Sequence, residues 1–305
     1  MKTLVAKFLA LSLITFACVV CLVWLLPDEP FSYQKAIADK HRMLSLTPGP
    51  RIILVGGSNL AFGIDSPRLS RKTGYQVVNM GLQAGFGLRF MLLETLPSLK
   101  ASDIVIIVPE YELFCGLLDG TPVYMASTVR IYPPAVKFIQ SPGQLINLVI
   151  GFPETLQEQV LWLENRPATN PVYSLETFNR YGDATLHLDK AGDQMDPKSL
   201  FKDYSVYDPT AVSVLNDFYA AALRRNAKVY MIYPPIPQES YLDKQTTIDS
   251  LVSELKLHLH IPILGGVENF LYPNNLFYDT TYHLIRKGRE RRTDEMARLI
   301  NGEVK

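Results

Sequence analysis

The chain has 305 residues, of which 48% are hydrophobic and 20% are charged, and its 30 basic side chains are balanced by 30 acidic ones. This composition can bury a sizeable core in one large domain or two small ones, and it argues against a disordered or repetitive protein. Because there is no net charge and no run of lysine and arginine, nothing predicts a groove for a phosphate backbone. We therefore expect no nucleic-acid partner.

The N-terminus predicts a membrane anchor. Residues 1–7 form a short stub with two lysines, residues 8–26 carry no charge, and Asp28 and Glu29 follow. An apolar run of this length just crosses a hydrocarbon core of about 30 Å. Lysines before the run and acids after it place the N-terminus in the cytoplasm. A cleaved signal peptide is the alternative, but the run is long for one and no small-residue cleavage site follows it.

Both alternatives place the remaining chain outside the cytoplasm. Cys115 is the one cysteine of this part, since Cys18 and Cys21 lie in the apolar run. A single thiol forms no internal disulfide, which suits many bacterial envelope proteins. The expected location is the bacterial inner membrane, with a single pass and an extracytoplasmic domain. Residues 27–50, polar and proline-flanked, are expected to be a stalk with one short helix.

The sequence from residue 51 to 112 predicts alternating strands and helices. The apolar run from Arg51 is the first strand and ends at Gly56 and Gly57. Two glycines can take backbone angles closed to other residues, so Ser58 can stand exposed in a crevice. Ser66 is expected to cap a helix with Pro67 at its first position, and Gly74 is expected to end this helix. Further strands are predicted at residues 75–79 and 103–108, with a helix at 88–99 between them. This order is typical of a doubly wound parallel α/β sheet.

The regular pattern lapses between residues 115 and 205, where prolines separate short helical stretches, including residues 144–150 and 155–163. So long an excursion is usually functional, so we interpret it as a mostly helical insertion that caps the site or faces the membrane or a partner. A structural excursion without function is the alternative. Regularity returns with helices at 208–226, 246–258 and 286–300 and strands at 228–233 and 261–264. The domain is thus expected to span residues 51–305.

Three residues could supply the chemistry of a serine nucleophile. A serine hydroxyl is a weak nucleophile until an imidazole takes its proton, and the imidazole needs a carboxylate to fix its tautomer. Ser58, His283 and Asp279 could fill these roles. A loop after the last strand can reach the first strand, because the C-terminal ends of parallel strands meet at one edge. The other histidines do not cluster with cysteines or acids, so no metal is expected, and no cofactor motif is present.

These residues resemble the SGNH (GDSL-like) hydrolases, in particular their membrane-anchored relatives from polysaccharide and teichoic-acid acylation systems. Gly56–Asn59 is similar to the first block of that family, and the resemblance makes Ser58 the nucleophile. Residues 78–81 are similar to the second block, which implies that the N–H groups of Ser58 and Gly81, or else Gly85, form the oxyanion hole. Asp279–His283 is similar to the last block. The resemblance covers residues 50–112 and 205–295.

The sequence departs from that family in three places. Gly57 stands where the family has an aspartate, and three residues separate Asp279 from His283 where two are common. The third block lacks its asparagine and instead brings Glu110 and Glu112, whose carboxylates would repel an oxyanion. Side chains near the predicted site are further candidates for substrate contact: Asn59, Asn79, Glu110, Tyr111, Arg180 and Tyr181.

Two hypotheses about function follow. The first is a serine-dependent esterase or O-acyltransferase, most simply for acetyl groups, that acts on a cell-surface glycan through an acyl-serine. The second is a non-catalytic scaffold subunit for a multi-spanning acyltransferase or a polysaccharide synthase. The anchor and the resemblance favour transfer, whereas the missing asparagine favours the scaffold.

Overall fold

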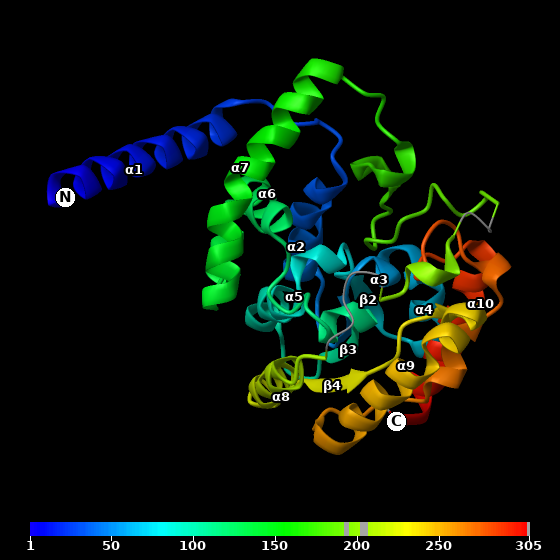
Figure 1. Cartoon of the computed structure of the whole chain (residues 1–305). Helices are drawn as coiled ribbons and strands as arrows, with labels where there is room; N and C mark the ends of the chain where they lie inside the picture. Colours follow the sequence, from blue (N-terminus) through cyan, green and yellow to red (C-terminus); the bar gives the residue numbers. More distant parts are fainter. Residues whose placement is uncertain (192–194, 202–206, 304–305) are drawn as a thin grey trace.

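A parallel sheet with the order β2-β1-β3-β4 forms the centre of the computed structural model, which describes residues 1–191, 195–201 and 207–303 (Figure 1). In this sheet Ile53 pairs with Val78 on one side and Val105 on the other. The strands are β1 (Arg51–Gly56), β2 (Gln76–Asn79), β3 (Ile104–Val108) and β4 (Lys228–Met231). Every residue of β1 and β3 is buried, as expected of strands covered on both faces. The predicted doubly wound α/β fold is confirmed.

Helices cover both faces of the sheet. Helix α5 (Leu88–Thr95) contacts β1 and α8 (Thr210–Leu223), whereas α4 (Ser66–Thr73) contacts β2 and α10 (Arg286–Glu303). Figure 1 shows these two pairs on opposite sides of the strands. The cap of α4 is Asp65 and not the predicted Ser66, because the Asp65 carboxylate accepts the Arg68 N–H at 2.9 Å. The helix ends, as predicted, at Gly74 in the left-handed conformation.

The last predicted strand is wrong in extent. Residues 261–264 contribute only an isolated parallel bridge between Ile263 and Met231. A separate parallel pair is formed by β5 (Ile236–Pro237) and β6 (Leu271–Tyr272). Helix α9 (Gln238–His258) lies between β5 and the bridge and is longer than predicted, with a kink at Lys244.

The segment predicted as a stalk belongs to the domain. Helix α2 (Ala36–Leu46) buries Ile37 and Leu44 in the main core. Its Lys40 is also buried and donates to the backbone carbonyls of Asn79 at 2.9 Å and Gly182 at 2.7 Å. The prediction of a spacer was wrong because it relied on the polar composition of this segment, whereas one face of the short helix is buried.

The insertion forms a helical cap. Helix α6 (Pro122–Ile131) packs against α7 (Pro142–Asn165), which joins the two predicted stretches into one helix with Pro153 inside it. Gly151 allows this close approach, since a Cβ atom at this position would lie only 2.0 Å from the Pro122 carbonyl oxygen. Residues 171–191 then return across the sheet edge toward the predicted site.

The N-terminal helix α1 (Lys2–Leu25) is long and apolar enough to cross a membrane, and most of its residues are exposed. Its C-terminal end is fixed to the cap. The Arg130 guanidinium donates to the carbonyl oxygens of Val23 at 2.5 Å and Leu26 at 2.7 Å, and Gln159 donates to the same two oxygens at 3.2 Å. These bonds satisfy helix-end carbonyls that have no partner within the helix.

Candidate active site

Ser58 lies where β1 leaves the sheet. Strand β1 ends at Gly56, and helix α3 (Ser58–Gly63) begins at Ser58 itself. The two glycines are required for space and not, as the sequence suggested, for unusual backbone angles, since Gly57 has a φ of −90°. A Cβ atom at Gly56 would lie 2.3 Å from the Val108 carbonyl oxygen, and one at Gly57 would lie 2.5 Å from the Glu110 carboxylate. The serine is half-buried at this turn.

Asp279 and His283 are held in a tight loop before α10. Phe277 and Leu284 form an antiparallel bridge, and the Tyr278 N–H donates to the His283 carbonyl at 2.8 Å. The Thr280 hydroxyl oxygen accepts the N–H of His283 at 3.1 Å. These bonds fold the loop back on itself, so that the two side chains four residues apart meet.

The imidazole of His283 is fixed on two sides. Its Nδ1 lies 2.9 Å from Asp279 Oδ1. An ionised carboxylate can only accept a hydrogen bond, so Nδ1 carries the hydrogen and Nε2 is the basic atom of the ring. The Phe62 ring stacks on the imidazole with centroids 4.0 Å apart and planes at 12°. Phe62 lies four residues after Ser58 in α3, so one short helix positions both the hydroxyl and the ring that packs on the histidine.

Tyr173 from the cap completes this arrangement. Its hydroxyl donates to Asp279 Oδ2 and lies 3.3 Å from His283 Nδ1. Burial acts to raise the pKa of Asp279, but the hydrogen bonds from His283 and Tyr173 outweigh it and hold the pKa below its ordinary value. Burial and the bond to Asp279 raise the pKa of Tyr173. The carboxylate therefore stays ionised beside the histidine.

One cavity of about 500 Å³ brings Ser58 and His283 together. Within the described residues no hydrogen bond joins the Ser58 hydroxyl to the imidazole, although both side chains line the same cavity. The other lining side chains come from all parts of the chain and include several aromatic rings and Gln83. The lining residues are Glu29, Ser32, Tyr33, Gln34, Phe62, Leu82, Gln83, Tyr124, Glu158, Tyr173, Thr280 and Tyr282.

The backbone N–H groups around Ser58 are divided between two roles. Glu110, which is buried, accepts the N–H of Gly57 at 3.1 Å and that of Asn59 at 3.0 Å. Within the described part of the chain, the N–H of Ser58 has no acceptor and is free for a substrate oxygen. Both oxygens of Glu110 are engaged with the start of α3, where the helix dipole favours a negative charge.

Of the two glycines expected to help hold an oxyanion, Gly81 does not present a free donor in this structure. The Gly81 N–H donates to the Asn79 side chain at 2.9 Å, and a Cβ atom at Gly81 would lie 2.4 Å from that of Leu60. Gly85 packs beneath the Tyr124 ring, which a Cβ atom would approach to 2.0 Å. Both glycines allow close packing. The Gly81 N–H is already engaged, and a role for Gly85 in an oxyanion hole stays a prediction.

Four of the expected substrate contacts are instead internal. Asn59 donates to the Val108 carbonyl at 2.8 Å and accepts from Arg292 at 2.6 Å. Asn79 donates to the Leu60 carbonyl at 3.0 Å and to Asp183 at 2.9 Å. Tyr111 is 1% exposed, and Glu110 is bound to backbone amides as described above. These side chains organise the base of the site because their polar atoms are already paired or buried.

Glu112 and the pair Arg180–Tyr181 also lie away from the serine. Burial raises the pKa of Glu112, although the Tyr282 hydroxyl donates to its Oε2 at 2.6 Å. Tyr282 itself lines the cavity, so Glu112 supports it from behind. Arg180 lines a different cavity, beside Lys40, and donates to the Tyr181 hydroxyl at 3.1 Å.

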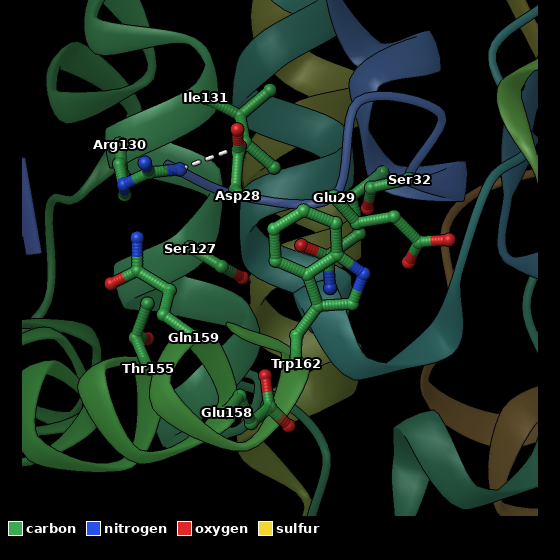
Figure 2. A pocket seen from close by; sticks show the side chains of 11 residues that line it. Asp28, Glu29, Ser32, Ser127, Arg130, Ile131, Thr155, Glu158, Gln159 and Trp162 are labelled. Carbon is green, nitrogen blue, oxygen red and sulfur yellow. Dashed lines mark hydrogen bonds and ion pairs between the residues drawn. The ribbon is translucent and has the colours of Figure 1, made fainter. Parts of the chain in front are cut away.

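A second, smaller cavity of about 140 Å³ adjoins the first and shares Glu29, Ser32, Gln34 and Glu158 with it. It lies between the C-terminal end of α1 and the cap helices. Figure 2 shows Arg130 paired with Asp28 on one side and the indole of Trp162 on the other. Burial and the neighbouring Glu154 raise the pKa of Glu158. The cavity thus offers hydroxyl, amide and carboxylate groups around one aromatic ring.

Sequence reasoning missed most of the cavity wall. Phe62 carried a usable indication, because it follows Ser58 at helical spacing. Tyr124, Glu158 and Tyr173 lie in the insertion, where no motif marked them. Their role depends on how the cap folds over the sheet.

Comparisons with known proteins add little to this description. No family model matches the chain, and no curated protein matches it. Among solved structures it is similar to a family two carbohydrate esterase from Clostridium thermocellum in complex with cellohexaose, at 11% identity and a TM-score of 0.36. The match covers 85% of this chain and 66% of that one, just under two thirds of its length.

Proposed function

We propose that this chain is a membrane-anchored serine enzyme that moves or removes an O-linked acyl group, most simply acetyl, on a cell-surface glycan. The observation that carries the proposal is that Ser58 and His283 line one cavity while Asp279 holds His283 Nδ1 at 2.9 Å. This leaves Nε2 as the atom that can take a proton from the serine.

The proposed reaction has two steps. Ser58 Oγ attacks the ester carbonyl carbon while its proton passes to His283 Nε2, and the Ser58 N–H stabilises the oxyanion. The ester oxygen of the donor leaves with that proton, and the acyl group stays on Ser58. A glycan hydroxyl, or water, then attacks the acyl-serine and gives its proton to His283, which passes it to Ser58 Oγ as the bond between Oγ and the acyl carbon breaks. Transfer and hydrolysis differ only in this acceptor.

The adjoining cavity supports a glycan as the acceptor or donor. Sugars bind to sites that combine an aromatic face with polar side chains that pair with hydroxyl groups. Trp162 and Glu158 supply both, next to the catalytic cavity. The location of this cavity at the end of α1 favours a substrate held at or near the membrane.

The test uses the full chain in detergent with an activated acetyl ester. Wild-type protein is expected to release the leaving group with a burst and to carry an acetyl group on Ser58, detected by mass spectrometry, whereas Ser58→Ala gives neither. Trp162→Ala is the matched test of glycan binding. Turnover of the small ester should persist in this variant, and acetylation of an oligosaccharide should fall. Equal turnover by wild type and Ser58→Ala, with no acyl-serine, would reject the enzyme.

A second candidate function is a non-catalytic scaffold for a multi-spanning acyltransferase or a polysaccharide synthase. It is favoured by the lack of a hydrogen bond between Ser58 and His283 in the described structure, and by the engagement of the Gly81 N–H. Surface acylation in cells separates the two. If it persists with Ser58→Ala at normal protein levels, the scaffold is supported; if it is lost, the enzyme is.

A further inference from the structure

The outer face of α7 is apolar and exposed. Its first half carries four aliphatic side chains, each between 42% and 58% exposed, spaced so that they share one side of the helix: Leu145, Ile146, Val149 and Ile150. The opposite side packs against α6, where Gly151 meets the Pro122 carbonyl. No charged residue occurs between Lys137 and Glu154. A patch of this kind on an extracytoplasmic domain has to be covered by something.

The apolar face continues into the contact with α1. Phe152 of α7 packs edge-on against Phe16 of α1, with ring centroids 6.1 Å apart. Val23 is completely buried between the two helices, and Leu148 and Leu156 line the same contact. Figure 1 shows α1 leaving the domain beside α7. The exposed aliphatic side chains therefore lie next to the helix that is long and apolar enough to span a membrane.

The position of the Phe16–Phe152 contact along α1 indicates how deep this contact lies in a membrane that α1 spans. Phe16 precedes the end of α1 by roughly nine residues, which corresponds to about 14 Å of helix. The hydrocarbon core of a bilayer is about 30 Å thick, so Phe16 lies near its middle when α1 spans it. Phe152, in contact with Phe16, then also lies below the membrane surface. Because Arg130 and Gln159 fix the end of α1, the domain cannot swing away on a loose tether.

We infer that the first half of α7 is a second membrane-embedded segment, which enters the outer leaflet beside α1 and seats the cap in lipid. The occupant of its apolar face is the acyl-chain region of the bilayer. The charge-free stretch before Glu154 has the length of an interfacial or re-entrant segment, too short to cross by itself. The charged residues of α7 begin at Glu154, and Glu158 lines the cavity that contains Ser58.

The test places an environment-sensitive fluorophore on the full chain in lipid vesicles that contain no other protein. Ile146→Cys is labelled with NBD in a background in which the three native cysteines are serine. Leu242→Cys is the matched control, because Leu242 on α9 is 69% exposed and lies outside the cap. Quenching is measured with aqueous iodide and with lipids that carry a doxyl group, and thermal unfolding confirms that both variants fold.

We expect the label at 146 to be quenched by doxyl lipid and protected from iodide, and the label at 242 to behave in the opposite way. Equal iodide quenching at the two positions would overturn the inference. Protection at 146 in native membranes but not in pure lipid vesicles would also overturn it, since a protein partner would then cover the face. The readout does not involve Ser58, so it is independent of the proposed activity.

Discussion

The carboxylate of Glu110 accepts the backbone N–H of Asn59 at 3.0 Å, and its second oxygen accepts that of Gly57 at 3.1 Å. Glu110 therefore occupies the space that a side chain at position 57 would need. The glycine before the serine and the acid that follows β3 thus share one space, which predicts an exchange: a side chain at one position excludes the side chain at the other. The carboxylate supports the turn that presents Ser58 instead of facing an oxyanion.

Removal of this carboxylate is expected to destabilise the protein. Glu110→Ala leaves two amides without acceptors and removes the negative charge near the buried Arg292, so we expect a loss of about 3–5 kcal/mol. Glu110→Gln keeps the shape of the side chain, but its NH₂ group then faces a backbone N–H that needs an acceptor, at a cost of about 1–3 kcal/mol. Thermal unfolding in mild detergent measures both. The exposed Glu176→Gln is the control, and equal melting of all three variants would contradict the exchange.

A side chain at position 57 provides a second test of the same exchange. Gly57→Asp should unfold the site, because its Cβ atom would lie 2.5 Å and 2.7 Å from the Glu110 oxygens and 2.8 Å from the Ala84 nitrogen. We expect the combined Gly57→Asp and Glu110→Ala variant to be more stable than Gly57→Asp alone. The coupling energy from the four-member cycle is the measurement. Additive losses would show that the two positions do not share one space.

Tyr173→Phe is expected to reduce turnover without unfolding the cap. The variant removes one of the donors that hold the pKa of Asp279 down, so His283 is less well oriented. A hydrogen bond to a charged group is worth about 1.5–3 kcal/mol, and we expect kcat to fall about tenfold or more with little change in KM. Tyr181→Phe is the matched control, because that hydroxyl contacts only Arg180 among the described residues. Equal turnover by both variants would remove Tyr173 from the site.

His187 should make the protein sensitive to mild acid. Burial, together with the nearby His283, lowers the pKa of His187 from 6.5 to about 4. The unfolded chain then binds a proton between these pH values while the folded chain does not, so stability falls as the pH falls from about 6.5 to about 4. The shift corresponds to roughly 3 kcal/mol over this window. In His187→Gln, which keeps a donor for the Phe62 carbonyl, unfolding should depend less on pH, and an unchanged slope would exclude His187 as the cause.

Local sequence patterns predicted the framework. Continuous β-branched runs gave β1 and β3, because strands covered on both faces need apolar side chains at every position. The same reasoning placed Ser58 at the end of the first strand and the apolar helix at the N-terminus. The assignment of catalytic roles to Ser58, Asp279 and His283 remains a prediction. In the structure Asp279 binds His283, and Ser58 and His283 line one cavity.

Only the tertiary structure decided what surrounds them. Glu110 reaches the turn at Ser58 from the end of the neighbouring strand β3, and Tyr173 reaches Asp279 from the cap. Helix α2 enters the core although its composition resembles a spacer. Periodicity and turn residues report which face of an element is buried, but not which distant element covers it. That choice follows from the packing of whole helices and strands, which is why the sequence determined the strand that ends at Ser58 and the fold determined which residues surround this serine.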